Sequence, residues 1–273
     1  MTLIPQAEMF AKAKSGGYAV GSFNVTSLEM AYGVIDAAES LNSPVILAVT
    51  DGHRLHFQLG PLTAGLRALA EDATVAVGLH LDHAESIETA AKALRLGFTS
   101  IMYDGPSQPW ADRLAETREL TRVAHGMGVL VEGSVSAQSR QTAVATSGSW
   151  ELPTDDIIAE FLSTTNVDIL AIGEGSSDLD PARVSAISSA TGTVTSLHGG
   201  SQLSNEQVAA MVASGLRKCS VYGKIASRAL ASLRSRAAAE AFTLLDVVDA
   251  TRSGFAEGVR VEIERLGSSG QNV

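Results

Sequence analysis

The 273-residue sequence has a single cysteine, Cys219, and no long apolar run. One cysteine excludes a disulfide within the chain, and low cysteine content is typical of proteins in the reducing cytoplasm. No apolar stretch approaches the roughly 18 residues that a membrane helix requires. The first residues also lack the basic segment followed by an apolar segment that marks a secretory signal. We therefore expect a cytoplasmic protein that makes no use of a membrane.

Basic side chains are also scarce. Twenty Lys and Arg residues against thirty Asp and Glu residues give a formal net charge of −10, which argues against nucleic acid as a partner. An anionic substrate would need local positive charge or backbone N–H groups in order to bind. Because lysines are so few, a lysine near a functional site is informative. The five lysines are Lys12, Lys14, Lys92, Lys218 and Lys224.

A regular alternation of short apolar runs and helically spaced stretches extends along the whole chain. The runs that predict strands are residues 18–25, 44–50, 74–83, 100–104, 128–135, 167–173, 193–200 and 218–223. Eight such units, with continuous apolar strands, predict a closed parallel (β/α)8 TIM barrel. An open doubly wound sheet is the alternative, but the sequence has no Gly-x-Gly-x-x-Gly turn.

The predicted organisation is a single TIM-barrel domain over residues 1–273, with the barrel core at 18–229. Residues 5–15 predict an additional helix before the first strand. The Ala-, Arg- and Glu-rich stretch at 230–266 predicts extra C-terminal helices. The last residues, 267–273, are rich in Gly and Ser and predict a disordered tail.

Polar groups follow nearly every expected strand, where the reactive residues of such a barrel collect. These strand-end residues are Asn24, Thr50, Asp51, Asp82, His83, Asp104, Glu132, Glu174, His198 and Lys224. Asp82 and His83 are adjacent, so they reach one site only where their strand gives way to a loop. The pair suits a chemistry in which an imidazole holds a metal while a carboxylate moves a proton. The alternative is that Asp82 only caps a helix.

Eight segments, in this order and spacing, resemble the class II (metal-dependent) ketose-bisphosphate aldolases of the fructose- and tagatose-bisphosphate aldolase family. They are YAVGSFNV (18–25), PVILAVTDG (44–52), VGLHLDHAES (77–86), GFTSIMYDG (97–105), VLVEGSV (129–135), LAIGEGSS (170–177), SLHGGS (196–201) and GLRKCSVYGK (215–224). The resemblance implies an aldehyde lyase that cleaves or forms a C–C bond in a phosphorylated sugar-like substrate through a metal-stabilised enediolate. It also implies zinc as the cofactor and a homo-oligomer of two or four copies.

By the same resemblance, Asp82 is the catalytic proton-transfer residue, and His83 and His198 are zinc ligands. Gly199, Gly200 and Ser201 correspond to a phosphate cradle built from backbone N–H groups. The other positions expected to bind substrate or phosphate are Asn24, Thr50, Ser177, Ser220, Val221, Tyr222, Gly223 and Lys224.

The sequence departs from the family at the metal site. Ser176 stands where the family has a third zinc-binding histidine, and Glu174 could replace that ligand or face solvent. Asp104 and Glu132 are either remnants of a second cation site or hydrogen-bond acceptors, because Ser134 replaces the glutamate that helps hold the extra metal in relatives. Zinc is therefore expected to bind weakly or to have been lost.

Further departures affect the substrate side. Residues 137–141 replace a glycine-rich flap, and the family's Asn-Val-Ala-Thr-Glu at the eighth strand is Ser-Val-Tyr-Gly-Lys at 220–224. These changes predict a substrate other than fructose 1,6-bisphosphate. Two alternatives stay open at this point. Lys224 could form a Schiff base in a metal-independent lyase, or the chain could be an inactive homologue that binds sugar phosphates.

Overall fold

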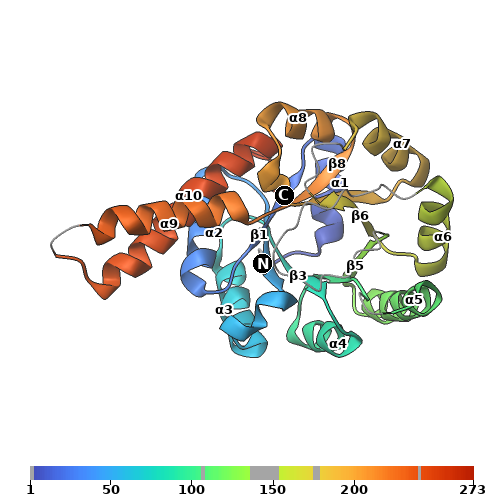
Figure 1. The fold of residues 1–273 in the computed structure, drawn as a ribbon, viewed down its shortest axis with the longest axis horizontal. Helices are drawn as coiled ribbons and strands as arrows, with labels where there is room; N and C mark the ends of the chain where they lie inside the picture. The colour runs from blue at the N-terminus through green and yellow to red at the C-terminus, as the bar shows by residue number, and fades with distance from the viewer. Residues whose placement is uncertain (1–2, 106–107, 136–153, 175–178, 239–240) are drawn as a thin grey trace.

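The computed structural model describes residues 3–105, 108–135, 154–174, 179–238 and 241–273, with the backbone alone at residue 174. Eight parallel strands close into a barrel in the order β1 to β8, and helices surround it (Figure 1). The strands are β1 Val20–Asn24, β2 Val45–Thr50, β3 Val77–Ala84, β4 Ser100–Tyr103, β5 Leu130–Ser134, β6 Ile169–Glu174, β7 Val194–His198 and β8 Leu216–Val221. The predicted (β/α)8 barrel is confirmed, and each strand overlaps its expected run, with boundaries that differ by a few residues.

The helices alternate with the strands, and two of them, α1 and α10, lie outside the repeat. They are α1 Gln6–Gly16, α2 Leu28–Ser40, α3 Leu59–Asp72, α4 Ile87–Leu96, α5 Trp110–Gly126, α6 Asp155–Thr165, α7 Pro181–Thr191, α8 Asn205–Ala213, α9 Gly223–Ala237 and α10 Leu244–Leu266. Short 3₁₀ turns, η1 Asp51–His56 and η2 Gly200–Gln202, follow β2 and β7. The helix expected at 5–15 and the C-terminal helices expected at 230–266 are thus present.

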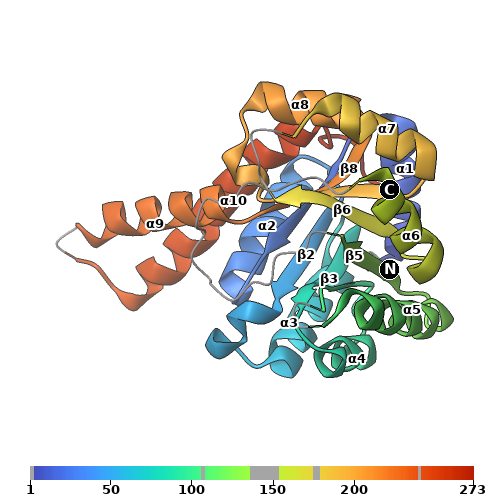
Figure 2. The same cartoon turned by 45° about the vertical axis from the view of Figure 1, so that its right-hand side comes forward.

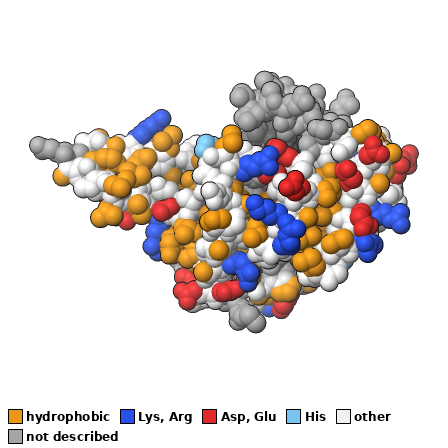
Figure 3. All heavy atoms as spheres, turned by 90° about the horizontal axis from the view of Figure 1, so that it is seen from below, with side chains coloured by type: hydrophobic (Ala, Val, Ile, Leu, Met, Phe, Trp, Pro, Cys, Tyr) orange, Lys and Arg blue, Asp and Glu red, His pale blue; other side chains and the backbone are white. Residues whose placement is uncertain are grey.

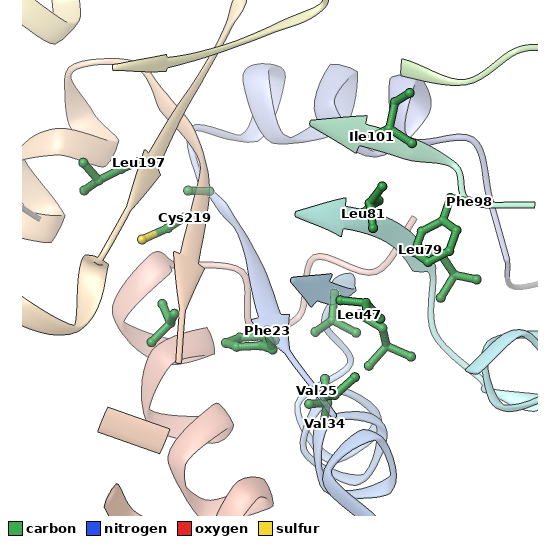
Figure 4. Close-up of a cluster of buried hydrophobic side chains, with 14 of the residues drawn as sticks. Phe23, Val25, Val34, Leu47, Leu79, Leu81, Phe98, Ile101, Leu197 and Cys219 are labelled. Carbon is green, nitrogen blue, oxygen red and sulfur yellow. The ribbon is translucent and has the colours of Figure 1, made fainter. Parts of the chain in front are cut away.

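Alternation along each strand divides its side chains between two buried regions. Phe23, Leu47, Leu79 and Leu81 point outward and join the buried side chains of the surrounding helices in one cluster (Figure 4). The residues between them, such as His80, point into the barrel, because a strand has a side-chain period of two. The strands are buried on both faces, as the continuous apolar runs predicted.

Apolar packing closes the lower, N-terminal end of the barrel. Met9 and Phe10 of α1 form a buried cluster with Val20, Ile46 and Ile169, which begin three of the strands or lie near their starts. These side chains bury apolar surface at this end of the barrel, where polar groups would be costly. The polar strand-end residues of the described part of the chain lie at the opposite end.

A bulge in β3 changes the expected geometry of Asp82 and His83. The predicted strand at 74–83 gave way to a loop at this pair, but β3 continues through both residues to Ala84. Its register with β4 shifts between Leu81 and Ala84, and His83 takes the left-handed backbone conformation with φ of 54°. The extra residue of a bulge re-aims a side chain, so both neighbours face the barrel mouth.

The C-terminal tail is ordered, so the predicted disorder at 267–273 is wrong. Ser268 is fully buried, and the backbone N–H of Gly270 donates to the Leu41 carbonyl at 2.8 Å. The Asn272 side chain accepts a hydrogen bond from the Ala76 N–H at 2.8 Å, just before β3. The tail is held because it supplies partners for backbone groups at the lower end of the barrel.

The end of α9 and the start of α10 form an arm that projects away from the barrel, whereas the rest of α10 packs against α2 (Figures 1 and 2). Close helix contact is possible where Gly254 faces Ala229, because a Cβ at Gly254 would collide with the backbone of α9. Hydrophobic side chains gather on the arm in Figure 3, and Leu244 and Leu245 are 80% and 72% exposed. Within the described residues, no helix has both the length and the apolar character to cross a membrane.

Candidate active site

Three ligand atoms converge at the mouth of the barrel, from β3 and from the end of β7. They are Asp82 Oδ1, His83 Nε2 and His198 Nδ1, all within 4.8 Å of one another. The two imidazole nitrogens are 3.0 Å apart, and Asp82 Oδ1 lies 3.5 Å from His83 and 3.6 Å from His198. All three residues are buried. The bulge in β3 is what allows two consecutive residues to contribute.

The opposite nitrogen of each imidazole is held by a carboxylate. His83 Nδ1 lies 2.7 Å from Asp104 Oδ2, and His198 Nε2 lies 2.8 Å from Glu132 Oε1. An ionised carboxylate only accepts hydrogen bonds, so these partners place the imidazole N–H groups on the outer nitrogens. The lone pairs of His83 Nε2 and His198 Nδ1 then face each other and Asp82.

Such an arrangement fits a bound cation. Within the described residues, Asp82 Oδ1 is buried and has no hydrogen-bond partner, which is costly for a charged oxygen. Two imidazole lone pairs point toward the same place, and histidine and carboxylate are common ligands of catalytic zinc. Carboxylates that orient metal-binding histidines from behind are a regular part of such sites. The donor set therefore agrees with a metal centre.

Asp82 is also fixed from its other oxygen. Asn24 Nδ2 donates to Asp82 Oδ2 at 3.0 Å, and Thr50 Oγ1 donates to the same atom at 2.9 Å. Burial would raise the pKa of the Asp82 carboxyl, but the imidazoles of His83 and His198 hold that pKa well below its usual value. The carboxylate is therefore ionised, with one oxygen held and the other turned to the cluster. Helix capping, the alternative role of Asp82, is excluded because Ser86 caps α4.

Glu132 is paired with a lysine that the sequence did not place at the site. Lys218 of β8 is fully buried, and its Nζ lies 2.6 Å from Glu132 Oε2 on β5, across the barrel. Burial would raise the pKa of Glu132, but the charge of Lys218 and the contact with His198 hold it well below its usual value. Both oxygens of Glu132 thus have nitrogen partners, which favours its interpretation as a hydrogen-bond acceptor. A remnant of a second cation site at Asp104 and Glu132 stays a prediction.

His80 lies beneath the cluster, inside the barrel. Its Nδ1 is 2.6 Å from Ser100 Oγ and its Nε2 is 3.3 Å from Lys218 Nζ. Burial, reinforced by the charge of Lys218, lowers the pKa of His80 to about 3, so the ring is neutral. The signal that could have revealed Lys218 was its place two residues before Ser220, on the same face of the strand, where a buried ionised side chain needs a partner.

Comparison with known proteins identifies the family to which this site belongs. The family described as fructose-bisphosphate aldolase class-II matches residues 5–271. The chain belongs to the class II fructose-bisphosphate aldolase family. Its members are lyases, and the relatives and solved structures below carry aldolase names.

Curated relatives and one crystal structure agree with this assignment. The fructose-bisphosphate aldolase of Thermus caldophilus is 34% identical over 225 residues, which are 78% of this chain and 73% of that protein. The 6-phospho-5-dehydro-2-deoxy-D-gluconate aldolase of Shouchella clausii (strain KSM-K16) is 35% identical over 245 residues, 81% of this chain and 79% of that protein. The crystal structure of the YdjI aldolase from Escherichia coli K12 has a TM-score of 0.87 at 25% identity and covers 99% of this chain and 100% of that chain.

The two turns expected to bind phosphate lie side by side in this class II aldolase. The Lys224 N–H at the start of α9 donates to Ser201 Oγ at 3.3 Å, which joins the turn after β7 to the turn after β8. Gly199 has a φ of 68°, and a Cβ at Gly200 would collide with Cys219 Sγ. Glycine is needed here because the turn crosses close over β8. The N-terminal N–H groups of α9 lie at the same rim, where a helix terminus favours an anion.

A buried arginine braces this turn from behind. Arg265 of α10 donates from Nη1 to the Gly200 carbonyl at 3.2 Å and from Nη2 to the Ser204 carbonyl at 3.1 Å. Its charge is paired with Glu262 at 2.7 Å. Arg265 was not expected from the sequence, because nothing in the local pattern connects a C-terminal helix with the turn after β7.

Lys224 does not join the cluster of Asp82, His83 and His198. It is exposed, and its Nζ donates to the Leu203 carbonyl at 3.0 Å. A Schiff-base lysine must present an unprotonated amine to the substrate carbonyl, normally from a buried or electropositive position. The structure therefore argues against the Schiff-base alternative at Lys224.

Part of the predicted site lies outside the described residues. Ser176, Ser177 and the segment at 137–141 that replaces the flap belong to this part. Glu174 ends β6 and pairs through its backbone with His198 on β7. Its backbone is thus at the correct place for a ligand, and its role as a ligand stays a prediction.

Proposed function

We propose that this chain is a metal-dependent aldehyde lyase that cleaves or forms a C–C bond in a phosphorylated sugar-like substrate. The observation that carries the proposal is the convergence of Asp82 Oδ1, His83 Nε2 and His198 Nδ1, each held from its far side, in a class II aldolase barrel. An inactive binding homologue would need no such convergence of buried lone pairs.

Zinc is the proposed metal, held by His83 and His198. Glu174 would supply the third ligand, since catalytic zinc commonly has three protein ligands and one open position. When bound, the ion would polarise the substrate carbonyl and stabilise the negative charge of the enediolate. With no third histidine, the site is expected to bind zinc more weakly than a site with three imidazoles.

Asp82 is the proposed proton carrier. Asn24 and Thr50 hold its Oδ2, so Oδ1 is oriented toward the reacting centre and needs no rearrangement. In the cleavage direction Oδ1 would take the hydroxyl proton from the carbon that becomes the aldehyde. The electron pair of the broken C–C bond then stays on the ketone half as the enediolate. Asp82 would then pass this proton to the enediolate carbon, which completes the ketone product. In the condensation direction Asp82 removes the proton from that carbon and returns it to the new hydroxyl group.

The phosphate group of the substrate is proposed to bind to the turns at 199–201 and 220–224, together with Ser177. Backbone N–H groups and the start of α9 give this rim local positive potential in a chain of net negative charge. The Ser-Val-Tyr-Gly-Lys sequence at 220–224 supports a substrate other than fructose 1,6-bisphosphate. A matched assay with fructose 1,6-bisphosphate and 6-phospho-5-dehydro-2-deoxy-gluconate tests this point, and faster cleavage of the first would contradict it.

Metal analysis combined with proton exchange tests the central proposal. Protein purified without chelator should contain zinc, and the His198→Ala variant should lose it. With zinc present, the protein should exchange a proton of dihydroxyacetone phosphate with solvent, as followed by NMR. Lys224→Met should retain this exchange, with at most weaker phosphate binding. Borohydride should trap no Schiff base between the protein and the substrate, in the wild type or in any variant. The proposal would be overturned if wild-type protein bound no zinc and did not exchange a proton of dihydroxyacetone phosphate.

We propose in addition that the chain is one domain, resides in the cytoplasm and forms a homo-oligomer. The single cysteine is buried and unpaired, which suits a reducing compartment.

The exposed leucines on the arm, Leu244 and Leu245, are typical of a surface that contacts another copy of the chain. Leu244→Glu with Leu245→Glu should then yield monomers in light scattering, and an unchanged mass would exclude this interface.

A further inference from the structure

The turn after β7 contains two consecutive glycines, which give it a soft backbone. Gly199 has a φ of 68°, and Gly200 lies so close to Cys219 that a Cβ would collide with its sulfur. Glycine therefore allows the close approach, but the lack of a Cβ also gives the turn access to several backbone conformations. A turn that must become ordered when its ligand binds loses affinity by the cost of that ordering.

Arg265 of α10 holds this turn from outside the barrel. Its Nη1 donates to the Gly200 carbonyl at 3.2 Å, and its Nη2 donates to the carbonyls of Leu203 and Ser204, the latter at 3.1 Å. The Gly200 carbonyl also accepts from the Leu203 N–H at 3.3 Å, so both of its lone pairs are used. One side chain thus ties together three carbonyl groups of the segment that follows β7.

The direction of the Gly200 carbonyl decides what the turn presents to an anion. In a trans peptide the C=O and N–H groups point in opposite directions. Because the Gly200 carbonyl is turned toward Arg265 on α10, the N–H of Ser201 in the same peptide unit points away from α10, to the barrel side of the turn. A flipped peptide would place the carbonyl oxygen on that side, where it would repel an anion.

The ion pair behind the turn is costly to the fold. The side chains of Glu262 and Arg265 are each 3% exposed, and Arg265 Nη1 lies 2.7 Å from Glu262 Oε2. Desolvation of two charges offsets most of their attraction, and Arg265 Nε is buried without a partner among the described residues. Apolar side chains would hold α10 equally well, so the contribution of Arg265 lies in its contacts with the turn. Since Glu262 neutralises the guanidinium, Arg265 acts by orienting the backbone and not by adding charge.

We propose that Arg265 is a positioning residue for the phosphate group of the substrate, which it serves by orienting the backbone N–H groups of residues 199–201. The inference rests on the proposed phosphate-binding role of this turn, and it adds a residue from α10, outside the (β/α)8 repeat. Arg265 itself does not touch the phosphate. Its removal should therefore weaken the binding of phosphorylated substrates and leave the metal-binding cluster intact.

The test compares Arg265→Met with Arg252→Met. Arg252 lies on the same helix, and its ion pair with Asp36 joins α10 to α2, away from the turn. Proton exchange by zinc-loaded protein is measured with dihydroxyacetone phosphate and with dihydroxyacetone, which lacks the phosphate. We expect Arg265→Met to raise the KM for dihydroxyacetone phosphate about tenfold, because hydrogen bonds to a charged group are lost, with kcat changed by less than about twofold. Exchange into dihydroxyacetone and zinc content should stay at wild-type values, and Arg252→Met should change none of these quantities.

Binding of inorganic phosphate gives a second readout that needs no activity. It is followed by ³¹P NMR in metal-free protein, so that phosphate cannot bind to zinc. The dissociation constant should rise about tenfold in Arg265→Met and stay unchanged in Arg252→Met. Arg265→Lys keeps a positive charge and fewer donors, and it should recover part of the lost affinity.

A double variant separates positioning from a general loss of structure. Arg265→Met leaves Glu262 buried without its partner, which can prevent folding. Arg265→Met combined with Glu262→Met removes both charges, and it should show the same loss of phosphate affinity because the turn still lacks its donor. Wild-type phosphate affinity in this double variant would overturn the inference. Equal losses with dihydroxyacetone phosphate and dihydroxyacetone would also overturn it, because they would indicate a purely structural role.

The proposed phosphate site and this inference fail in distinguishable ways. If wild-type protein binds no inorganic phosphate and does not prefer dihydroxyacetone phosphate to dihydroxyacetone, the phosphate site fails and the inference fails with it. If wild-type protein shows both properties and Arg265→Met keeps them, only the inference fails.

Discussion

The two ends of the barrel interior use the same strands for opposite purposes. On β7, Val194 packs into the apolar lower cluster and His198, four residues later, faces the metal-binding cluster. On β2, Ile46 and Thr50 divide in the same way. The lower end contains apolar contacts that stabilise the fold, whereas the upper end contains buried charges that compensate one another.

The difference shows where stability and chemistry are separable. Apolar burial contributes about 25 cal/mol per Å² and does not depend on a particular partner. A buried ion pair such as Glu132 with Lys218 contributes little net stability, because the desolvation of both charges offsets their attraction. The upper cluster is therefore expected to be costly to the fold and essential to the reaction, and the lower cluster the reverse. Substitutions at the two ends test this contrast.

The largest effect is expected for Asp82→Asn at the upper end. Loss of the proton carrier should lower turnover by about 10²–10⁴-fold, measured as proton exchange into dihydroxyacetone phosphate. Stability should stay the same or rise, because the substitution removes a buried charge whose Oδ1 has no partner among the described residues. A large loss in the free energy of unfolding, with exchange retained, would reverse the assignment of the two ends.

At the lower end, Phe10→Ala should have the opposite signature. Phe10 is 2% exposed and packs in the lower cluster, so its truncation should cost about 3–5 kcal/mol of unfolding free energy in urea titrations. Zinc affinity and turnover of the folded protein should be close to those of the wild type. The contrast would be broken if this variant lost zinc while keeping its stability.

The pH dependence of stability should originate at the upper end. The pKa of His80 is lowered to about 3 in the folded protein, whereas an unfolded histidine titrates near 6.5. Between these values the unfolded chain binds a proton that the native chain does not, so stability falls as the pH decreases from about 6.5 toward 3. The slope contributed by His80 is at most about 1.4 kcal/mol per pH unit. In urea titrations at pH 7, 6 and 5, His80→Gln should reduce this slope, and an equal slope would exclude His80 as its source.

Much of the architecture followed from the sequence because it depends on local patterns. Apolar runs and their spacing fix the strands, and parallel strands bring their carboxyl ends to one rim. Asn24, Thr50, Asp82 and His198 therefore meet at the mouth as expected. The position of His83 at the mouth was also predicted. The bulge that turns its side chain toward the mouth was not, since a bulge with a left-handed histidine has no clear signature in sequence.

Contacts between distant strands could not be predicted in the same way. Lys218 meets Glu132 only because the closed barrel places β8 opposite β5, and that pairing depends on tertiary structure. The sequence therefore points to Lys224, at the predicted strand end, and not to Lys218 within the strand.

The order of the C-terminal tail could not be predicted for a related reason. Its composition favours disorder, but partners at Leu41 and Ala76, far away in sequence, hold it in place.

The smallest effect is expected at the ordered tail, which belongs to the lower end. Asn272→Ala removes the side-chain acceptor of the buried Ala76 N–H, and an unpaired buried N–H group costs about 1 kcal/mol or somewhat more. For a chain of this size, that corresponds to a fall in the melting temperature of roughly 2–4 °C, measurable by calorimetry. Asn272→Asp serves as the matched variant, because it keeps an acceptor oxygen and should lose less. Neither variant should change proton exchange, since the tail meets β3 at its start and Asp82 lies at the opposite end of that strand. If Asn272→Ala lowered exchange while leaving the melting temperature unchanged, the two ends of the barrel would be coupled in a way that the division between apolar and charged layers does not allow.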